Sequence, residues 1–445
     1  MTISADKVRQ SLSDHVQVDA FDLVVDLERS QGSHLVDEVT GTTYLDFYTF
    51  FASCPLGLNP PQLAGAQFER RLLTAARNKP ANSDAYTTYL AEFVETFARV
   101  AGDPRLPHLF FVEGGALAVE NALKTAFDWK SRRNEAAGRS PELGMQVMHL
   151  TKAFHGRSGY TMSLTNTEPV KVARYPKFDW PRIDVPAITF PLEEHLDEVG
   201  AAEQHALQQA RAAFERFPDD IACFLAEPIQ SEGGDNHLRP QFLQAMQQLC
   251  REHNALFVLD EVQTGLGLTG TTWCYQQLGL EPDIVAFAKK AQVGGIMAGG
   301  RVDEVADNVF QVSSRINSTW GGGLADMVRS QALLEAIEET GAVQNAAAMG
   351  SVLLSQLQDL ARRHPNTVSN ARGRGLLCAI DLPDGQLRGQ VLSRLFTDEH
   401  VLLLPCGDRS IRFRPILSVT EEDLTRATAA LDRVLSSLTD SRGEG

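Results

Sequence analysis

Two apolar runs of strand length, each ending abruptly in charge, constrain this chain more than any other feature. The first ends at Asp260 after residues 256–259, and the second ends at Lys289 after residues 284–288. In an open α/β sheet, ligands bind outside the carboxyl ends of parallel strands, so one crevice would receive both Asp260 and Lys289. The same spacing is equally compatible with an ordinary ion pair between two strand ends.

A lysine and a carboxylate delivered to one crevice are the two groups that pyridoxal 5′-phosphate requires of a protein. This cofactor needs a lysine amine that holds it as a Schiff base and an acid that keeps its ring nitrogen protonated. A second lysine, Lys290, follows Lys289 directly. Because strand alternation sends neighbouring side chains to opposite faces, we expect only one of the two lysines to face a cofactor.

The composition is that of a globular protein and limits the classes of function. The chain has 445 residues, of which 43% are hydrophobic, and a formal net charge of −16. This acidic balance disfavours a nucleic-acid partner, whose phosphates would need a basic face. No hydrophobic leader follows Met1, and no apolar run reaches the ~18 residues of a membrane span. The six cysteines lack CxxC spacing, so we expect free thiols in a cytoplasmic protein and no metal site.

From residue 108 the chain alternates between strand-length apolar runs and helices. Strands are expected at 109–112, 146–150, 221–226 and 256–260, with helices at 117–129, 196–217 and 240–253 between them. Such alternation favours an α/β fold, in which a mostly parallel sheet is covered by helices on both faces. Residues 169–191 are rich in proline and are expected to form a surface stretch.

The two ends of the chain differ from this alternating region. A β-hairpin is expected within 33–47, and apolar residues at helical spacing predict helices between 62 and 100. After residue 325, helices at 326–339 and 343–363 lead to strands at 374–380, 401–404 and 410–413 and to a last helix at 421–438. We therefore divide the chain into an N-terminal segment of a small domain (1–60), a large domain (61–325) and the C-terminal part of the small domain (326–445).

A glycine turn, Glu-Gly-Gly-Ala at 113–116, opens the first helix of the alternating region. Backbone N–H groups at a helix N-terminus bind anions, so the turn is a candidate phosphate cradle. The chain lacks GxxxxGK[ST] and GxGxxG, which speaks against an ATP P-loop and a dinucleotide site. Most glycine turns of this kind are merely structural, and this one alone does not define a site.

Six features, taken in order along the chain, resemble the class III (ω-amino acid) aminotransferases, which are pyridoxal phosphate enzymes of fold type I. They are the turn at 113–116, Phe-His-Gly at 154–156, Glu-Pro at 227–228, Asp-Glu-Val-Gln-Thr-Gly at 260–265, Lys289 and the loop around Thr319. Each feature is weak alone, but the ordered set covers essentially the whole chain. The resemblance implies a large domain with a mostly parallel seven-stranded sheet, a smaller α+β domain, and a homodimer with shared active sites.

Three runs, at 113–121, 154–160 and 317–322, further resemble the branch of this family that acts on L-lysine. This likeness implies transfer of the ε-amino group to 2-oxoglutarate, giving L-glutamate and 2-aminoadipate 6-semialdehyde, which cyclises to piperideine-6-carboxylate. Two runs depart from the wider family. Glu-Gly-Gly-Ala-Leu replaces the usual Ser-Gly-Thr/Ser-Glu-Ala, and Lys290 with Gly-Gly at 294–295 resembles 4-aminobutyrate aminotransferases. A 4-aminobutyrate or ornithine aminotransferase is therefore the alternative.

The resemblance assigns cofactor-binding roles residue by residue. Lys289 takes the place of the Schiff-base lysine and would move protons once it is freed. Asp260 would favour the protonated ring nitrogen by its opposite charge, and Gln263 would contact the 3′-oxygen. The remaining cofactor contacts would come from Phe154 on the ring, His155 beside it, Gly115 and Ala116 at the phosphate, and Thr319 from the neighbouring subunit.

The resemblance also assigns the cations that would bind substrate carboxylates. Arg157 is the candidate for the α-carboxylate of lysine, and Arg412 is the candidate for the α-carboxylate of 2-oxoglutarate. Glu232 would pair with Arg412 in one half-reaction and swing aside in the other, and Asn317 would hold distal polar groups of the substrate. Alternation puts Arg412 and Arg414 on one face of a strand, and both could also be ordinary exposed residues.

Two further classes of function compete with amino transfer. An aminomutase would return the amine to the same carbon skeleton and would need no keto acid. A cofactor-binding regulator without turnover would require an added basic helix-turn-helix module, whereas every stretch of this acidic chain is claimed by one catalytic fold.

Overall fold

The computed structural model describes residues 3–443 and is built around one sheet of seven strands. The strand order is β3-β11-β10-β9-β6-β4-β5, in which β10, β9, β6, β4 and β5 pair in parallel and β11 runs antiparallel to both neighbours. The strands span His108–Val112 (β3), Gln146–Leu150 (β4), Arg182–Ile183 (β5), Ile221–Ala226 (β6), Leu256–Asp260 (β9), Ile284–Phe287 (β10) and Gly294–Ala298 (β11). The predicted α/β fold with a mostly parallel sheet is confirmed.

This sheet is buried on both faces, which explains why its strands are continuously apolar. Alternate residues join different cores: in β9, Phe257 and Leu259 belong to one core, and Leu256 and Val258 belong to the other. Burial of apolar surface stabilises the fold by about 25 cal/mol per Å², and a charged side chain between the two cores would give up this gain. Charged side chains are therefore confined to the strand ends.

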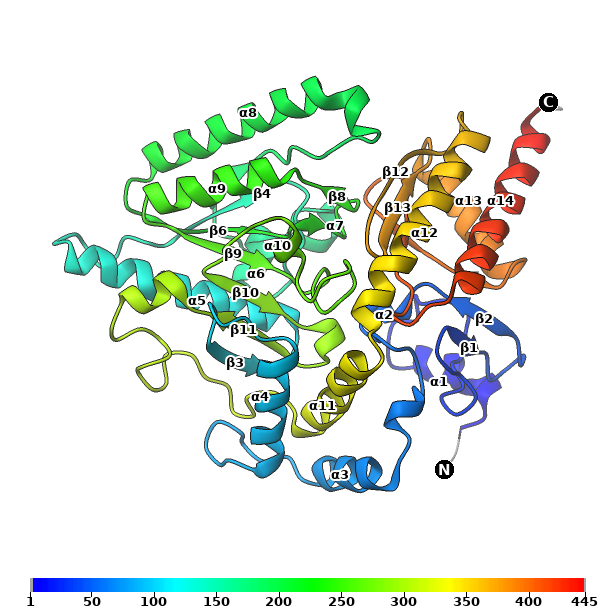
Figure 1. Cartoon of the computed structure of the whole chain (residues 1–445), viewed down its shortest axis with the longest axis horizontal. Coiled ribbons are helices and arrows are strands. Elements are labelled where there is room, and N and C mark those ends of the chain that lie inside the picture. Colours follow the sequence, from blue (N-terminus) through cyan, green and yellow to red (C-terminus); the bar gives the residue numbers. More distant parts are fainter. Residues whose placement is uncertain (1–2, 444–445) are drawn as a thin grey trace.

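Helices cover the sheet from both sides. α5 contacts β3, β6, β9, β10 and β11, whereas α9 contacts β6 and β9 and carries α8 on its outer side (Figure 1). The helices of this region span Ala66–Arg77 (α3), Thr88–Val100 (α4), Gly115–Ala136 (α5), Gly159–Leu164 (α6), Pro169–Val172 (α7), Leu192–Arg216 (α8), Pro240–Glu252 (α9), Cys274–Gln277 (α10) and Leu324–Glu339 (α11). Between β6 and α9, a small hairpin is formed by Ile229–Gln230 (β7) and Asn236–His237 (β8).

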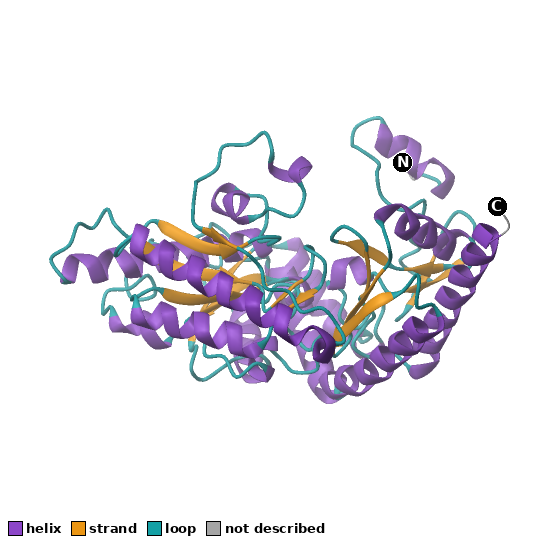
Figure 2. Ribbon diagram, turned by 90° about the horizontal axis from the view of Figure 1, so that it is seen from above, coloured by secondary structure: helices purple, strands orange, loops and turns teal. Residues whose placement is uncertain are grey.

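A second region brings the two ends of the chain together. β1 and β2 form the predicted hairpin, and β14 from the C-terminal part pairs with β2 in parallel. Next to it lies an antiparallel sheet in the order β12-β13-β16-β15, and Figure 2 shows this sheet and the large sheet side by side, each flanked by helices. The elements here are Val8–Ser13 (α1), His34–Val36 (β1), Thr43–Asp46 (β2), Thr49–Ala52 (α2), Ala342–Arg363 (α12), Ser369–Arg374 (β12), Leu377–Asp381 (β13), Gly385–Thr397 (α13), Val401–Leu402 (β14), Leu404–Cys406 (β15), Ser410–Phe413 (β16) and Glu421–Gly443 (α14).

Two local features differ from the sequence-based expectations. Strand β11 is not predicted, because Gly294 and Gly295 weaken its pattern. Lys289 and Lys290 lie in a 3₁₀ turn after β10 and not in the strand, so alternation along a strand does not separate their side chains. All six cysteines are free thiols, and all but Cys54 are buried. Across residues 3–443, no helix combines the length and the apolar character that crossing a membrane requires.

Candidate active site

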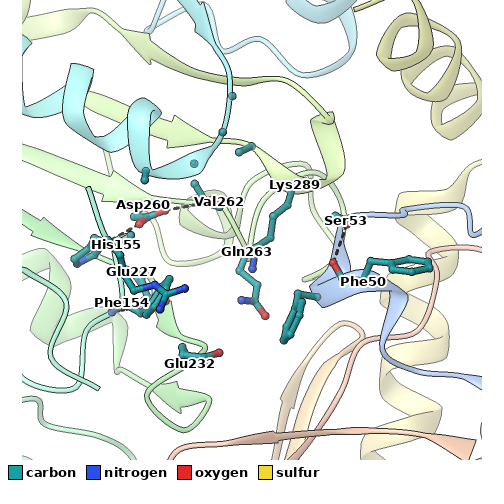
Figure 3. A pocket seen from close by; sticks show the side chains of 18 of the residues that line it. Phe50, Ser53, Phe154, His155, Glu227, Glu232, Asp260, Val262, Gln263 and Lys289 are labelled. Carbon is teal, nitrogen blue, oxygen red and sulfur yellow. Dashed lines mark hydrogen bonds and ion pairs between the residues drawn. The ribbon is translucent and has the colours of Figure 1, made fainter. Parts of the chain in front are cut away.

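A cavity of about 810 Å³ opens where the parallel strands of the large sheet end. Its lining includes residues that follow β3, β4, β6, β9 and β10, as expected for an α/β sheet. Figure 3 shows Lys289 and Gln263 pointing into the space between Asp260 and Phe50. The predicted site residues that line the cavity are Gly115, Ala116, Phe154, His155, Arg157, Glu232, Asp260, Gln263 and Lys289. A cavity of this size suits a small organic ligand.

Asp260 is a fixed carboxylate at the end of β9. Its Oδ2 accepts a hydrogen bond from His155 Nδ1 at 2.8 Å, and its Oδ1 accepts one from the backbone N–H of Val262 at 3.0 Å. Behind this pair, Glu227 accepts a hydrogen bond from the backbone N–H of Phe154, and burial raises the pKa of Glu227 to about 7. Both oxygens of Asp260 are therefore held from inside the protein, which fixes the direction in which its charge acts.

The glycine turn places the N-terminus of α5 at the cavity. Gly114 has a φ of +87°, a conformation that disfavours any residue with a Cβ. A Cβ on Gly115 would lie 2.9 Å from Val262 Cγ1, so a larger residue would force that side chain to move. The first N–H groups of this 22-residue helix have no partner within the helix and form a cradle for an anion.

Lys289 occupies an unusual backbone conformation directly after β10. Its φ is +43°, in the left-handed region that residues other than glycine seldom adopt. Burial lowers the pKa of Lys289 to about 8, and the positive charges of Arg412 and Arg414 act in the same direction. The amine therefore gives up its proton much more readily than that of an ordinary lysine, which favours a role as nucleophile and proton carrier.

Lys290 is buried, not at the surface, and contributes to the position of Gln263. Its Nζ donates to the main-chain oxygen of Gln263 at 2.6 Å. The side chain of Gln263 is held by a second cation, because Arg414 Nε donates to its Oε1 at 2.9 Å. With Oε1 engaged in this way, the Nε2 group of Gln263 is the part of the amide that can donate to a ligand.

Arg412 and Arg414 are both buried, so the interpretation as ordinary exposed strand residues is wrong. Arg414 donates to Gln263, to Asp235 and to the carbonyl of Phe413, and these bonds engage Nε, Nη1 and Nη2. Arg412 donates from Nη2 to Glu232 Oε2 at 2.8 Å. Within residues 3–443, Nε and Nη1 of Arg412 are buried without a hydrogen-bond partner. Arg412 is thus the arginine with donors left for a carboxylate.

Glu232 bridges two cations from the turn between β7 and β8. Its Oε2 accepts from Arg412, and its Oε1 accepts from Lys171 Nζ at 2.8 Å. Burial alone would raise the pKa of Glu232, but the two cations outweigh burial and lower it to about 2. The carboxylate is therefore charged at every physiological pH and covers Arg412.

An aromatic wall faces these groups from a left-handed turn at Thr49–Ala52 (α2). All four residues have positive φ values, between 43° and 60°. The hydroxyl of Thr49 donates to the carbonyl of Arg414 at 2.7 Å and fastens the turn to the small sheet. The turn places Phe50 and Phe51 in the cavity lining.

Three predicted substrate or cofactor residues are exposed. Arg157 lines the cavity, whereas Asn317 and Thr319 lie in the loop before α11 and do not line it in the described chain. The resemblance expects Thr319 to act in the neighbouring subunit's site, and its exposure leaves it accessible to such a contact.

Sequence reasoning missed part of the cavity lining, namely Phe50, Phe51, Ser53, Lys171, Val262, Ala288, Gln292, Val293 and Arg329. Lys171 comes from α7 inside the stretch that proline content marks as surface. The only signal that sequence offers for the aromatic wall is the density of aromatic residues directly after the hairpin.

Comparisons with known proteins agree with this geometry. The family model described as aminotransferase class-III matches residues 15–435. A protein named L-lysine-epsilon aminotransferase from Amycolatopsis lactamdurans is 59% identical and spans 97% of this chain and 96% of its own length. One of the same name from Streptomyces clavuligerus is 57% identical, spanning 99% and 96%. The solved lysine aminotransferase of Mycobacterium tuberculosis is 57% identical, with a TM-score of 0.96 over 98% of this chain and all of that one.

The chain belongs to the class III aminotransferases, and pyridoxal 5′-phosphate is its cofactor. The residues present fit that group. The glycine cradle can take the phosphate, Asp260 can supply the negative charge that the ring nitrogen needs, and the amine of Lys289 has a pKa lowered to about 8.

Proposed function

We propose that this aminotransferase moves the ε-amino group of L-lysine to 2-oxoglutarate, giving L-glutamate and 2-aminoadipate 6-semialdehyde, which cyclises to piperideine-6-carboxylate. The observation that carries the proposal is the guanidinium of Arg412, covered by Glu232 yet left with two unpartnered nitrogens. Lysine has no carboxylate beside its reacting amine and needs Arg412 covered, whereas 2-oxoglutarate has one and needs Arg412 free. The names of relatives at 57–59% identity over nearly the whole chain support the same substrate.

The residues around the cavity then divide the chemical work. Pyridoxal 5′-phosphate, when bound, supplies the electron sink for the carbon that carries the amine. Lys289 Nζ removes the proton from that carbon and delivers it in the reverse half-reaction, which suits a pKa of about 8. Asp260, oriented by His155, would keep a negative charge opposite the ring nitrogen, and Gln263 would donate from its Nε2 group to the 3′-oxygen of the cofactor.

Substrate binding requires cations at two distances from the reacting atom. When the ε-amine of lysine lies at Lys289, the α-carboxylate is a full chain length away, and we assign it to Arg157. Asn317, which lies outside the cavity of the single chain, keeps its proposed role toward distal polar groups of the substrate. The carboxylate next to the oxo group of 2-oxoglutarate lies close to the reacting carbon, and we assign it to Arg412.

We also propose that the active chain is a cytoplasmic homodimer in which Thr319 completes the phosphate site of the neighbouring subunit. The exposure of Thr319 in the single chain supports this arrangement. Mixed dimers of Lys289→Ala and Thr319→Ala chains should then recover activity that neither variant dimer has. We place the small domain in residues 1–60 and 326–445, and the pairing of β2 with β14 supports joining the two ends of the chain in one domain. Helix α11 forms the junction, because it packs on α3 and α4 of the large region and leads directly into α12.

A half-reaction without keto acid tests the substrate. The purified holoenzyme is mixed separately with L-lysine, L-ornithine and 4-aminobutyrate, and the conversion of the cofactor is followed by absorbance. Fast conversion with lysine, together with a positive o-aminobenzaldehyde test for the cyclic imine, is the expected result. Conversion with 4-aminobutyrate or ornithine but not with lysine would show that the enzyme is a 4-aminobutyrate or ornithine aminotransferase.

A further inference from the structure

We propose that Lys171 is a positioning residue that holds Glu232 when this carboxylate leaves Arg412. The inference rests on the proposed function, because it concerns how one site alternates between lysine and 2-oxoglutarate. It gives a role to α7, a short helix in the proline-rich stretch that neither the sequence motifs nor the cofactor roles involve.

The geometry is that of a carboxylate shared between two cations, one on each oxygen. Glu232 Oε2 lies 2.8 Å from Arg412 Nη2, and Glu232 Oε1 lies 2.8 Å from Lys171 Nζ. The two bonds are independent, so the carboxylate can give up the first and keep the second. Glu232 is also the most exposed of the three side chains, at 25%, which leaves it room to turn.

The main chain around Glu232 is anchored and restricts the movement to the side chain. The carbonyl of Glu232 accepts the N–H of Gly407 at 3.0 Å, which ties the β7–β8 turn to the small sheet. The N–H of Ser231 donates to Glu227 Oε2 at 3.1 Å. The carboxylate therefore leaves Arg412 by rotation about its own side-chain bonds, and Lys171 lies within reach of that rotation without any rearrangement of the backbone.

Lys171 itself is held at the cavity. Its Nζ lies 5.4 Å from the centre of the Phe154 ring and 3.2 Å from Glu168 Oε1, and its side chain is only 18% exposed. An ammonium group has three donors, so these contacts do not compete with the bond to Glu232. The cation is present before the carboxylate moves.

The consequence is unequal for the two states of the switch. When Glu232 covers Arg412, it has two cationic partners, and when it is displaced, Lys171 is the one that remains. Removal of Lys171 therefore weakens the uncovered state more than the covered state. The affinity for ligands that need Arg412 free, such as 2-oxoglutarate, should therefore fall, whereas the reaction with lysine should not change.

The test compares Lys171→Met with the control Glu168→Gln, which removes the exposed partner of Lys171 and leaves the contact with Glu232. The two half-reactions are measured separately on the holoenzyme, and binding of glutarate, a dicarboxylate that does not react, is measured by calorimetry. For Lys171→Met we expect kcat/KM for 2-oxoglutarate and the affinity for glutarate to fall about tenfold, the size of one lost charge-assisted hydrogen bond. The lysine half-reaction and all values for the control should stay within about twofold.

A double-mutant cycle shows whether Lys171 acts through Glu232. In a Glu232→Gln background, Lys171→Met should no longer weaken glutarate binding, and Lys171→Arg in the native background should restore most of it. An equal loss of both half-reactions would overturn the inference. So would a loss of glutarate affinity that persists in the Glu232→Gln background, because Lys171 would then bind the ligand directly. Absence of any reaction of the native enzyme with lysine would instead contradict the proposed function.

Discussion

Two carboxylates in the cavity each contact a basic side chain at 2.8 Å, but they differ in how completely they are held. The Asp260–His155 pair is 5% and 0% exposed, and the second oxygen of Asp260 is bound by the backbone. Glu232 is 25% exposed, and its partner Arg412 keeps two unpartnered nitrogens. A carboxylate whose hydrogen bonds are all made inside the protein stays in place. A carboxylate whose partner keeps unused donors can be replaced at that partner by a ligand.

The largest effect should come from Lys289, the residue that we propose acts in both half-reactions. Lys289→Ala should reduce each half-reaction by at least about 10⁴-fold, because the general acid–base and the Schiff-base nitrogen are lost together. Borohydride reduction followed by mass spectrometry should find no covalently retained cofactor in this variant. If the cofactor were retained covalently in Lys289→Ala but not in Lys290→Met, the reactive lysine would be Lys290.

Asp260→Asn tests the fixed contact. It should lower both half-reactions equally, by about 10²-fold or more, because the ring nitrogen loses the charge that keeps it protonated, whichever amine reacts. The variant is compared with Glu227→Gln, which keeps the hydrogen-bonding shape behind the site. A loss confined to one half-reaction would contradict the assignment of Asp260 to the cofactor.

Glu232→Gln tests the exchangeable contact, and here the losses should be unequal. The lysine half-reaction should fall about tenfold, because Arg412 is left without its anionic cover, while the glutamate half-reaction should change by less than about threefold. Stopped-flow absorbance separates the two. Equal losses would remove the distinction between the two carboxylates.

The smallest effect concerns the pH dependence of stability in the cofactor-free protein. Lys289 has a pKa of about 8 when folded, below the ordinary value of 10.5, so the unfolded chain binds its proton more tightly. Between about pH 8 and pH 10.5 the free energy of unfolding should therefore rise relative to that of Lys289→Met, by about 1–3 kcal/mol. The pKa of Glu232 is also lowered, to about 2, so the free energy of unfolding again rises with pH but in another window. The stabilising contribution of Glu232 is complete above about pH 4.5 and is lost as the pH falls toward 2. Urea unfolding of both proteins at pH 7.5 and pH 10 checks the difference.

Sequence was a good guide to the centre of the fold because burial on both sheet faces imposes a pattern on every residue. The runs that form β6, β9 and β10 are apolar throughout, and the charges that end the last two mark the site. Strand β11 escaped because its glycines are selected for close packing: a Cβ on Gly294 would lie 2.5 Å from the carbonyl oxygen of Gly114. A glycine that is required because it has no side chain does not raise the strand propensity of its run, so the strand cannot be recognised from the sequence.

The candidate site was predictable where a motif ties chemistry to a strand end, and not where tertiary contact creates it. Asp260 and Lys289 follow apolar runs and could be placed without coordinates. Lys171 becomes meaningful only because α7 folds back beside the β7–β8 turn, a contact between residues 61 positions apart. The choice between Arg412 and Arg414 likewise depends on which guanidinium has its donors occupied, and spacing carries no information about that.

The left-handed turn at Thr49–Ala52 bears on how much heat this protein can withstand. Left-handed conformations cost residues with a Cβ roughly 1–2 kcal/mol each, so this single turn removes several kcal/mol from a net stability that is typically only ~5–15 kcal/mol. In return, the chain contributes Phe50 and Phe51 to the cavity lining from a segment too short for an ordinary helix. Substitutions that relaxed this turn would raise the thermal stability of the protein. The same substitutions would remove part of the apolar surface that can contact a substrate's carbon chain.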